Sequence, residues 1–182
     1  MLRVLIRKQG LIFCYNKHMQ WDKISDIILI SSLVILAVFA VLGLIQLIQR
    51  KSLWKVDRAL LAFIPPLVLM AITYFVFYKF IVLNVRPNGS GEPSFPSTHV
   101  MVVATIFFIS FFAIPKYVKS NVARTIIFLM MLILLGLVCA GRILSNMHWL
   151  SDVIGALIFS AIFTLIYYFI SRDKDKKEDH NE

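Results

Sequence analysis

Long uncharged, apolar stretches alternate with short polar segments along most of the chain. A helix needs roughly 20 residues to cross about 30 Å of hydrocarbon, and slightly shorter helices still span where flanking side chains reach the interface. The pattern therefore predicts an all-α integral membrane bundle of about five transmembrane helices. The five apolar stretches are residues 27–49, 59–78, 100–115, 125–141 and 153–171.

Composition agrees with a membrane protein. Of the 182 residues, 59% are hydrophobic and 16% are charged, whereas a soluble domain has about 45–50% apolar and 25% charged residues. The loops are short and no repeat is visible, which indicates one domain. We expect an N-terminal extension over 1–23, for which a place at the membrane interface is one of two interpretations, a membrane-embedded domain over 24–171 and a charged cytoplasmic tail over 172–182.

The net charge of +9 is distributed as in a membrane protein, not as in a nucleic-acid-binding one. Basic residues sit in the short segments between apolar stretches, as the positive-inside rule describes. If all five stretches span, 11 basic residues lie on the side of the C-terminus and 8 on the other side. The difference predicts a multi-pass protein of the cell membrane with a cytoplasmic C-terminus.

Residues 1–18 admit two interpretations. Basic groups interrupt their apolar character, so a secretory signal is a poor description. If translation started at Met19, the count of basic residues would become 11 against 4. The segment is then either an upstream extension or a peripheral amphipathic segment, and the sequence does not decide between them.

The exception to the apolar pattern is the segment 79–99. Its centre, 87–93, concentrates proline, glycine, asparagine and serine, which form turns and not helix. Irregular backbone is not tolerated against lipid, so this segment must lie outside the hydrocarbon or line a cavity.

Ionisable residues beside membrane spans are costly to keep and indicate function. Counting five spans places three cations, two histidines and one carboxylate on one membrane face, which is a set suited to binding a phosphate and cleaving its ester. They are Lys79, Arg86, His99, Arg142, His148 and Asp152.

Spacing within this set adds detail. His148 and Asp152 are four residues apart, so on a helix the carboxylate can hold one imidazole nitrogen and leave the other free to attack. Ser97 precedes the apolar run at the position of a helix N-cap. The free N–H groups of such a helix start, together with the positive end of its dipole, favour a bound anion.

Three blocks of these residues resemble the signature of the type 2 phosphatidic acid phosphatase superfamily, which includes membrane lipid phosphatases, soluble acid phosphatases and vanadium haloperoxidases. The blocks are Lys79-x6-Arg86-Pro87, Pro96-Ser97-Thr98-His99 and Arg142-x5-His148-x3-Asp152.

The resemblance implies a role for each position. His148 would be the nucleophile that forms a phosphohistidine, Asp152 would orient it, and His99 would be the general acid. The resemblance further implies phosphate binding by Lys79, Arg86, Ser97, Thr98 and Arg142. It implies no metal and no cofactor, with the cations supplying the electrostatic stabilisation.

The chain departs from the family pattern in three ways. Thr98 stands where the second block usually has glycine, and Gly141 stands where the third block usually has serine before Arg142. Membrane members commonly have six spans, with the first block after the third span. Here that block follows the second span, so one N-terminal helix is absent unless residues 2–15 lie in the interface.

We expect a metal-independent phosphatase acting on a membrane lipid, either a phosphomonoester or a diphosphate. Phosphatidylglycerol phosphate, phosphatidic acid and undecaprenyl diphosphate are all possible substrates. A non-hydrolytic lipid-phosphate binding or transport protein is the alternative, although retention of both histidines and the aspartate counts against it. A haloperoxidase is a third possibility that five spans disfavour.

Two further sets of residues have structural interpretations. Cys14 and Cys139 indicate neither a disulfide framework nor a metal site. Gly136 and Gly155 lie inside apolar stretches, where glycine usually allows two helices to pack closely.

Overall fold

The structure, a computed structural model, describes residues 2–172, with side chains described from His18 onward except that of Trp54. All of its regular elements are helices. In chain order they are α1 (Leu2–Arg50), η1 (Leu53–Lys55), α2 (Arg58–Leu61), α3 (Ile64–Lys79), α4 (Thr98–Tyr117), α5 (Asn121–Leu144) and α6 (Leu150–Arg172).

Five segments in the described part of the chain are long and apolar enough to cross a membrane, which confirms the predicted helical bundle. They are His18–Arg50, Arg58–Lys79, Thr98–Tyr117, Asn121–Leu144 and Leu150–Arg172. The second span contains a break between α2 and α3. Its cause is local, because α3 begins with two prolines in its first turn, where their missing N–H groups are tolerated.

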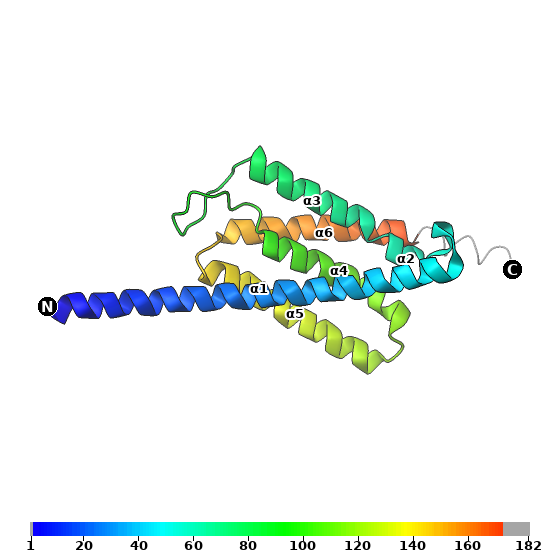
Figure 1. The fold of residues 1–182 in the computed structure, drawn as a ribbon, viewed down its shortest axis with the longest axis horizontal. Coiled ribbons are helices and arrows are strands. Elements are labelled where there is room, and N and C mark those ends of the chain that lie inside the picture. The colour runs from blue at the N-terminus through cyan, green and yellow to red at the C-terminus, as the bar shows by residue number, and fades with distance from the viewer. Residues whose placement is uncertain (1, 173–182) are drawn as a thin grey trace.

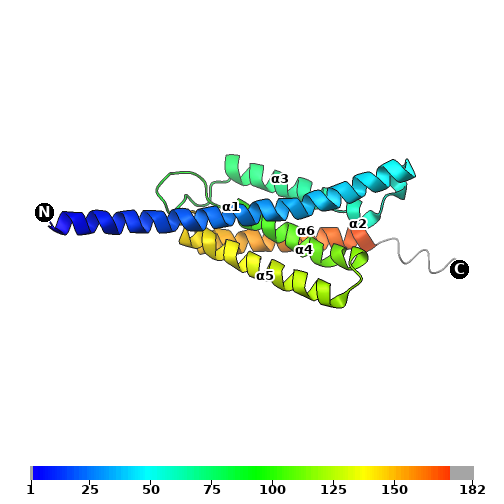
Figure 2. The same ribbon diagram turned by 60° about the horizontal axis from the view of Figure 1, so that its bottom comes forward.

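Helix α4 forms the centre of the bundle. It is surrounded by α1, α3, α5 and α6 (Figures 1 and 2), and most of its side chains are buried. Polar contacts join it to α6, since Thr105 Oγ1 donates to Ser160 Oγ (3.1 Å) and Ser160 Oγ donates to the carbonyl of Met101 (3.0 Å). Small hydroxyl residues at such contacts let helices approach closely and bond across a lipid environment.

Helix α1 is longer than a membrane span requires. Its 49 residues extend roughly 73 Å at 1.5 Å per residue, and its N-terminal part passes beyond the ends of the other helices (Figure 1). The expected boundary at residue 23 therefore falls inside a continuous helix. The expected charged tail begins at Arg172, and its residues 173–182 lie outside the part of the chain that the structure describes.

One end of the bundle collects the parts that carry the signature blocks. The start of α4, the end of α5, the start of α6 and the irregular segment 80–97 all lie there, on the same side as the N-terminus of α1 (Figure 1). The five-span arrangement thus brings the three blocks together, as the sequence predicts.

Candidate active site

The irregular segment 80–97 folds back on itself over this end of the bundle. Two backbone hydrogen bonds close it, one from Ser94 N to the carbonyl of Asn84 (2.9 Å) and one from Arg86 N to the carbonyl of Glu92 (3.0 Å). The turn between them contains two glycines at positive φ, a backbone conformation that glycine adopts without steric cost. The loop presents Arg86 and Ser94 to the helices beneath it.

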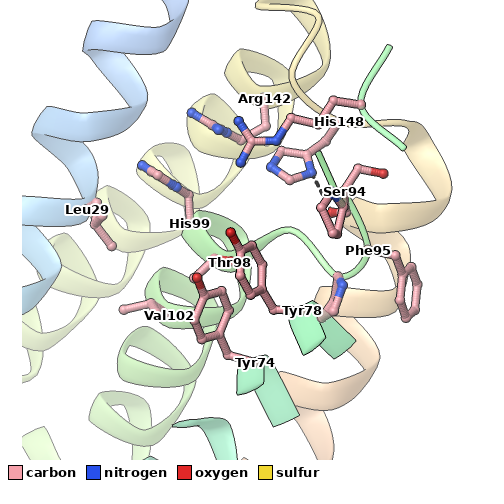
Figure 3. A pocket seen from close by; sticks show the side chains of 13 residues that line it. Leu29, Tyr74, Tyr78, Ser94, Phe95, Thr98, His99, Val102, Arg142 and His148 are labelled. Atoms are coloured by element: carbon pink, nitrogen blue, oxygen red, sulfur yellow. Dashed lines mark hydrogen bonds between the residues drawn. The ribbon is translucent and has the colours of Figure 1, made fainter. Parts of the chain in front are cut away.

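A cavity of about 250 Å³ lies under the loop, between α1, α3 and α4. The side chains of His148, His99 and Arg142 point toward one another around it, together with two tyrosines of α3 (Figure 3). The lining residues are Leu29, Tyr74, Tyr78, Arg86, Pro93, Ser94, Phe95, Pro96, Thr98, His99, Val102, Arg142 and His148.

His148 is held in one orientation by the backbone of the loop. It lies between α5 and α6, its side chain is 5% exposed, and its Nδ1 donates to the carbonyl of Ser94 at 2.8 Å. Burial lowers the pKa of His148 from its ordinary 6.5 to about 4, the charge of Arg142 acts in the same direction, and the carboxylate of Asp152 opposes both. The imidazole is therefore neutral near pH 7, with Nε2 as its unprotonated nitrogen.

Asp152 does not make the direct bond that its spacing predicts. Its Oδ2 lies 3.6 Å from His148 Nδ1 and accepts instead from the backbone N–H of Trp149 at 2.9 Å. Its Oδ1 accepts from Asn84 Nδ2 at 2.9 Å. The carboxylate is fully buried and caps the start of α6. Its influence on His148 is electrostatic, and the hydrogen-bond acceptor is the carbonyl of Ser94.

The two cavity arginines each have a carboxylate partner. Arg86 Nη1 lies 3.1 Å from Glu92 Oε2, and Arg142 Nη1 lies 2.5 Å from Asp22 Oδ1. The side chain of Arg142 is 4% exposed, and a buried guanidinium without a partner would be strongly destabilising.

Buried donors around the cavity still lack acceptors. Among the described residues, Arg86 Nε, Arg142 Nε, Ser94 Oγ and Ser97 Oγ are buried without a hydrogen-bond partner. Each such group costs about 1–3 kcal/mol when nothing compensates it. An anion between the two guanidinium groups would supply acceptors for the arginine donors.

The start of α4 has the geometry of an anion site. Ser97 occupies its N-cap, as predicted, with extended backbone. The Ser97 side chain makes no capping bond, and its N–H donates to the carbonyl of Asp152 (3.1 Å). The first N–H groups of a helix have no intrahelical acceptor. Thr98 and His99 therefore bring free backbone donors to the cavity wall.

Lys79 is not part of the cavity lining, contrary to the sequence-based expectation. It is the last residue of α3, and its side chain is exposed. Tyr74 and Tyr78 face the cavity from the same helix, four residues apart and with ring centroids 5.6 Å apart. Because successive residues turn by about 100° around a helix, Lys79 points away from the face that carries the tyrosines.

The signature blocks also miss two carboxylates on α1. Asp22 contacts Arg142 as described above, and Asp26 Oδ1 accepts from His99 Nε2 at 2.8 Å. Their spacing of four residues is a helical signal, but nothing local in the sequence connects them to residues more than 70 positions away. Within the described residues, no group of three or more His, Cys, Asp or Glu side chains is arranged to hold a metal ion.

Comparisons with known proteins place this chain in a family. The model of the PAP2 superfamily matches residues 65–176, which is more than half of the chain and contains all three signature blocks. No curated protein sequence matches the chain. A similar fold occurs in the crystal structure of the first transmembrane PAP2-type phosphatidylglycerolphosphate phosphatase from Bacillus subtilis, with a TM-score of 0.61 and 18% identity over 88% of this chain and 77% of that one. The chain is a multi-pass membrane protein and belongs to the PAP2 superfamily.

Proposed function

We propose that this chain is a lipid phosphate phosphatase that works through a phosphohistidine on His148. The observation that carries the proposal is the cavity, in which a neutral imidazole, a second histidine and two guanidinium groups meet. A binding or transport protein would need only the cations. An imidazole whose proton is fixed on Nδ1 by the Ser94 carbonyl is prepared for attack through Nε2.

The first step forms a bond between His148 Nε2 and phosphorus while the bond from phosphorus to the leaving oxygen breaks. His99 gives its proton to that oxygen. Water then attacks phosphorus, its proton passes to His99, and the phosphorus–nitrogen bond breaks. Inorganic phosphate leaves, and both histidines return to their starting protonation states.

Fixed positive charge replaces a metal in this mechanism. Arg86 and Arg142 would hold the equatorial phosphoryl oxygens, where charge is greatest in the transition state. The backbone N–H groups at the start of α4 and the hydroxyl of Ser97 would add hydrogen bonds. We propose that no metal is required. Asp152 would act by stabilising the positive charge that His148 acquires, and Lys79 would at most raise the local positive potential.

The residues that line the cavity support a lipid substrate. Arg86 and His148 lie in loops at its polar end, whereas Leu29 and Val102 line it from within spanning helices. A phosphate attached to an acyl or isoprenoid chain has the same polarity along its length. Phosphatidylglycerol phosphate, phosphatidic acid and undecaprenyl diphosphate all fit this description, and the fold similarity makes phosphatidylglycerol phosphate the first to test.

Phosphate release from these three lipids by the purified protein in detergent tests the proposal. We expect release with an excess of chelator present, inhibition by vanadate, and loss of activity in His148→Ala. His18→Ala is the matched control, because His18 lies outside the cavity and its removal should leave activity unchanged. Binding of all three lipids without release would favour the non-hydrolytic alternative, and a requirement for added magnesium would contradict the metal-free mechanism.

A further inference from the structure

Helix α1 lies outside the region that the family model matches, yet it contributes two carboxylates to the site. Asp26 Oδ1 accepts from His99 Nε2 at 2.8 Å, and Asp22 Oδ1 accepts from Arg142 Nη1 at 2.5 Å. Residues four apart lie on one face of a helix. One face of α1 therefore contacts both the proposed general acid and a proposed phosphate ligand.

The close approach of α1 depends on Gly141. A Cβ at this position would lie 2.5 Å from Ser25 Oγ and 3.3 Å from the carbonyl oxygen of Trp21. Ser25 is fully buried and donates to that same carbonyl, so it has little room to move. Gly141 stands where the family signature has serine, and the space that a side chain there would fill is occupied by Ser25, which lies between the two aspartates on α1.

The distribution of charge gives each carboxylate a separate partner. Arg86 and Arg142 are permanently charged and line the same cavity as His99, so they oppose a positive charge on its imidazole. Glu92 is paired with Arg86, and Asp22 is paired with Arg142. Asp26 is the carboxylate in contact with His99, and His148 is neutral near pH 7.

We propose that Asp26 is the positioning residue of the general acid. This inference rests on the proposed phosphatase function. Asp26 holds Nε2–H of His99 and stabilises the imidazolium form, which leaves Nδ1–H as the proton that passes to the leaving oxygen when its bond to phosphorus breaks. Asp22 positions Arg142 in the same way, and it is Arg142 that binds the phosphoryl group.

A purely structural role for Asp26 is a weaker explanation. The Asp26 side chain is 53% exposed and that of His99 is 23% exposed, and exposed ion pairs contribute little to stability. Loss of Asp26 should therefore leave the bundle folded and affect the step in which His99 gives up its proton.

Leaving groups of different basicity separate these roles. An alkyl phosphate such as dioctanoyl phosphatidic acid needs a proton on its leaving oxygen, whereas p-nitrophenyl phosphate does not. We expect Asp26→Asn to lower kcat for the alkyl substrate by about tenfold, part of the roughly 10²- to 10⁴-fold contribution of a general acid, and kcat for the aryl substrate by less than about twofold. Asp22→Asn is the matched control, and it should change both rates by the same factor.

Two further variants test the link to His99 and to helix packing. In a His99→Ala background, Asp26→Asn should cause no additional loss with the alkyl substrate, because the two residues act as one unit. Gly141→Ala should displace α1, and with it both aspartates, so it should lower both rates and that of the alkyl substrate more. Melting temperatures in detergent should show that Asp26→Asn remains folded.

The outcomes distinguish this inference from the function on which it rests. A wild-type protein that hydrolyses neither substrate would overturn both. If the wild type turns over both substrates, three results would overturn the role of Asp26 and leave the phosphatase function standing. They are equal losses with the two substrates in Asp26→Asn, additive losses in the double variant, and a faster reaction after removal of the carboxylate.

Discussion

At the scale of single residues, the site depends on how the surroundings of His148 set its protonation. Its Nδ1–H is held by a backbone carbonyl, and its burial next to Arg142 lowers its pKa to about 4. A backbone acceptor cannot be protonated near neutral pH, so it fixes one tautomer over a wide pH range. The buried carboxylate of Asp152 acts from 3.6 Å, which limits how far the pKa of His148 falls.

This arrangement predicts that His148 titrates near pH 4. Because its folded pKa lies below its ordinary value of 6.5, the unfolded chain binds more protons between these two values. The free energy of unfolding should therefore decrease as pH falls through that window. Nitrogen NMR of imidazole-labelled protein, assigned with His148→Gln, measures the titration directly.

The same experiment on Asp152→Asn provides the control. Since the carboxylate raises the pKa of His148, its removal should move the titration to a lower pH. A titration near pH 6.5 in the wild type, or a shift to higher pH in Asp152→Asn, would contradict this description of the site.

Part of the site can be predicted from the sequence because its residues occur at fixed spacing near the ends of spans. His99, Arg142 and His148 are identified in this way and meet in one cavity. The Ser94 carbonyl cannot be predicted, because a backbone acceptor has no sequence signal. Asp22 and Asp26 are also missed, since their partners are distant in sequence and the contact depends on the packing of α1.

At the scale of secondary-structure elements, contacts between helices and the irregular loop fix the catalytic groups. Gly155 on α6 lies against the ring of Phe95, where an added Cβ would come within 2.3 Å of Cε2. The Phe95 ring packs edge-on against the ring of Phe77, with the ring centroids 5.2 Å apart. Phe95 directly follows Ser94, whose carbonyl holds His148. Gly155 is thus a close-packing position, as predicted, although its partner is the loop and not a second helix. The same prediction for Gly136 is wrong, because nothing lies within 4 Å of a Cβ there.

The two glycines form a matched pair for mutagenesis. Gly155→Ala should displace Phe95 and the Ser94 carbonyl, destabilise the protein by about 1–3 kcal/mol as overpacked cores do, and lower kcat. Gly136→Ala should leave both stability and kcat unchanged or raise the melting temperature slightly, because alanine is the better helix former. Melting temperature in detergent and phosphate release measure the two effects. Equal behaviour of the two variants would show that the contact with Phe95 does not position the loop.

At the scale of the whole molecule, the five spans follow from hydrophobic length alone, and the structure confirms them. The spans exceed the uncharged stretches at both ends, because helices continue into polar residues at the interface, as at Arg58 and Arg172. The length of α1 and its contact with the site are not predictable from hydropathy, which measures transfer into lipid and not packing between helices. The segment 79–99 is predicted to lie outside the lipid or to line a cavity, and its irregular part, 80–97, covers the cavity end of the bundle.

The membrane orientation is a proposal that follows from the distribution of basic residues. Eleven basic residues on the side of the C-terminus against eight on the other favour a cytoplasmic C-terminus and an extracytoplasmic cavity. A cysteine introduced at Ser90, after removal of Cys14 and Cys139, should react with a membrane-impermeant thiol reagent in intact cells. Labelling that occurs only after lysis would show the opposite orientation and would leave the proposed chemistry unaffected.

The central claim is that His148 carries the phosphoryl group during turnover, and trapping the intermediate tests it most directly. Wild-type protein mixed with a ³²P-labelled lipid phosphate and quenched in alkali should retain an acid-labile, alkali-stable label, as expected of phosphohistidine. The label should map to the peptide containing His148 and be absent from His148→Ala. Label retained by His148→Ala, or located on a different residue of the wild-type protein, would contradict the account.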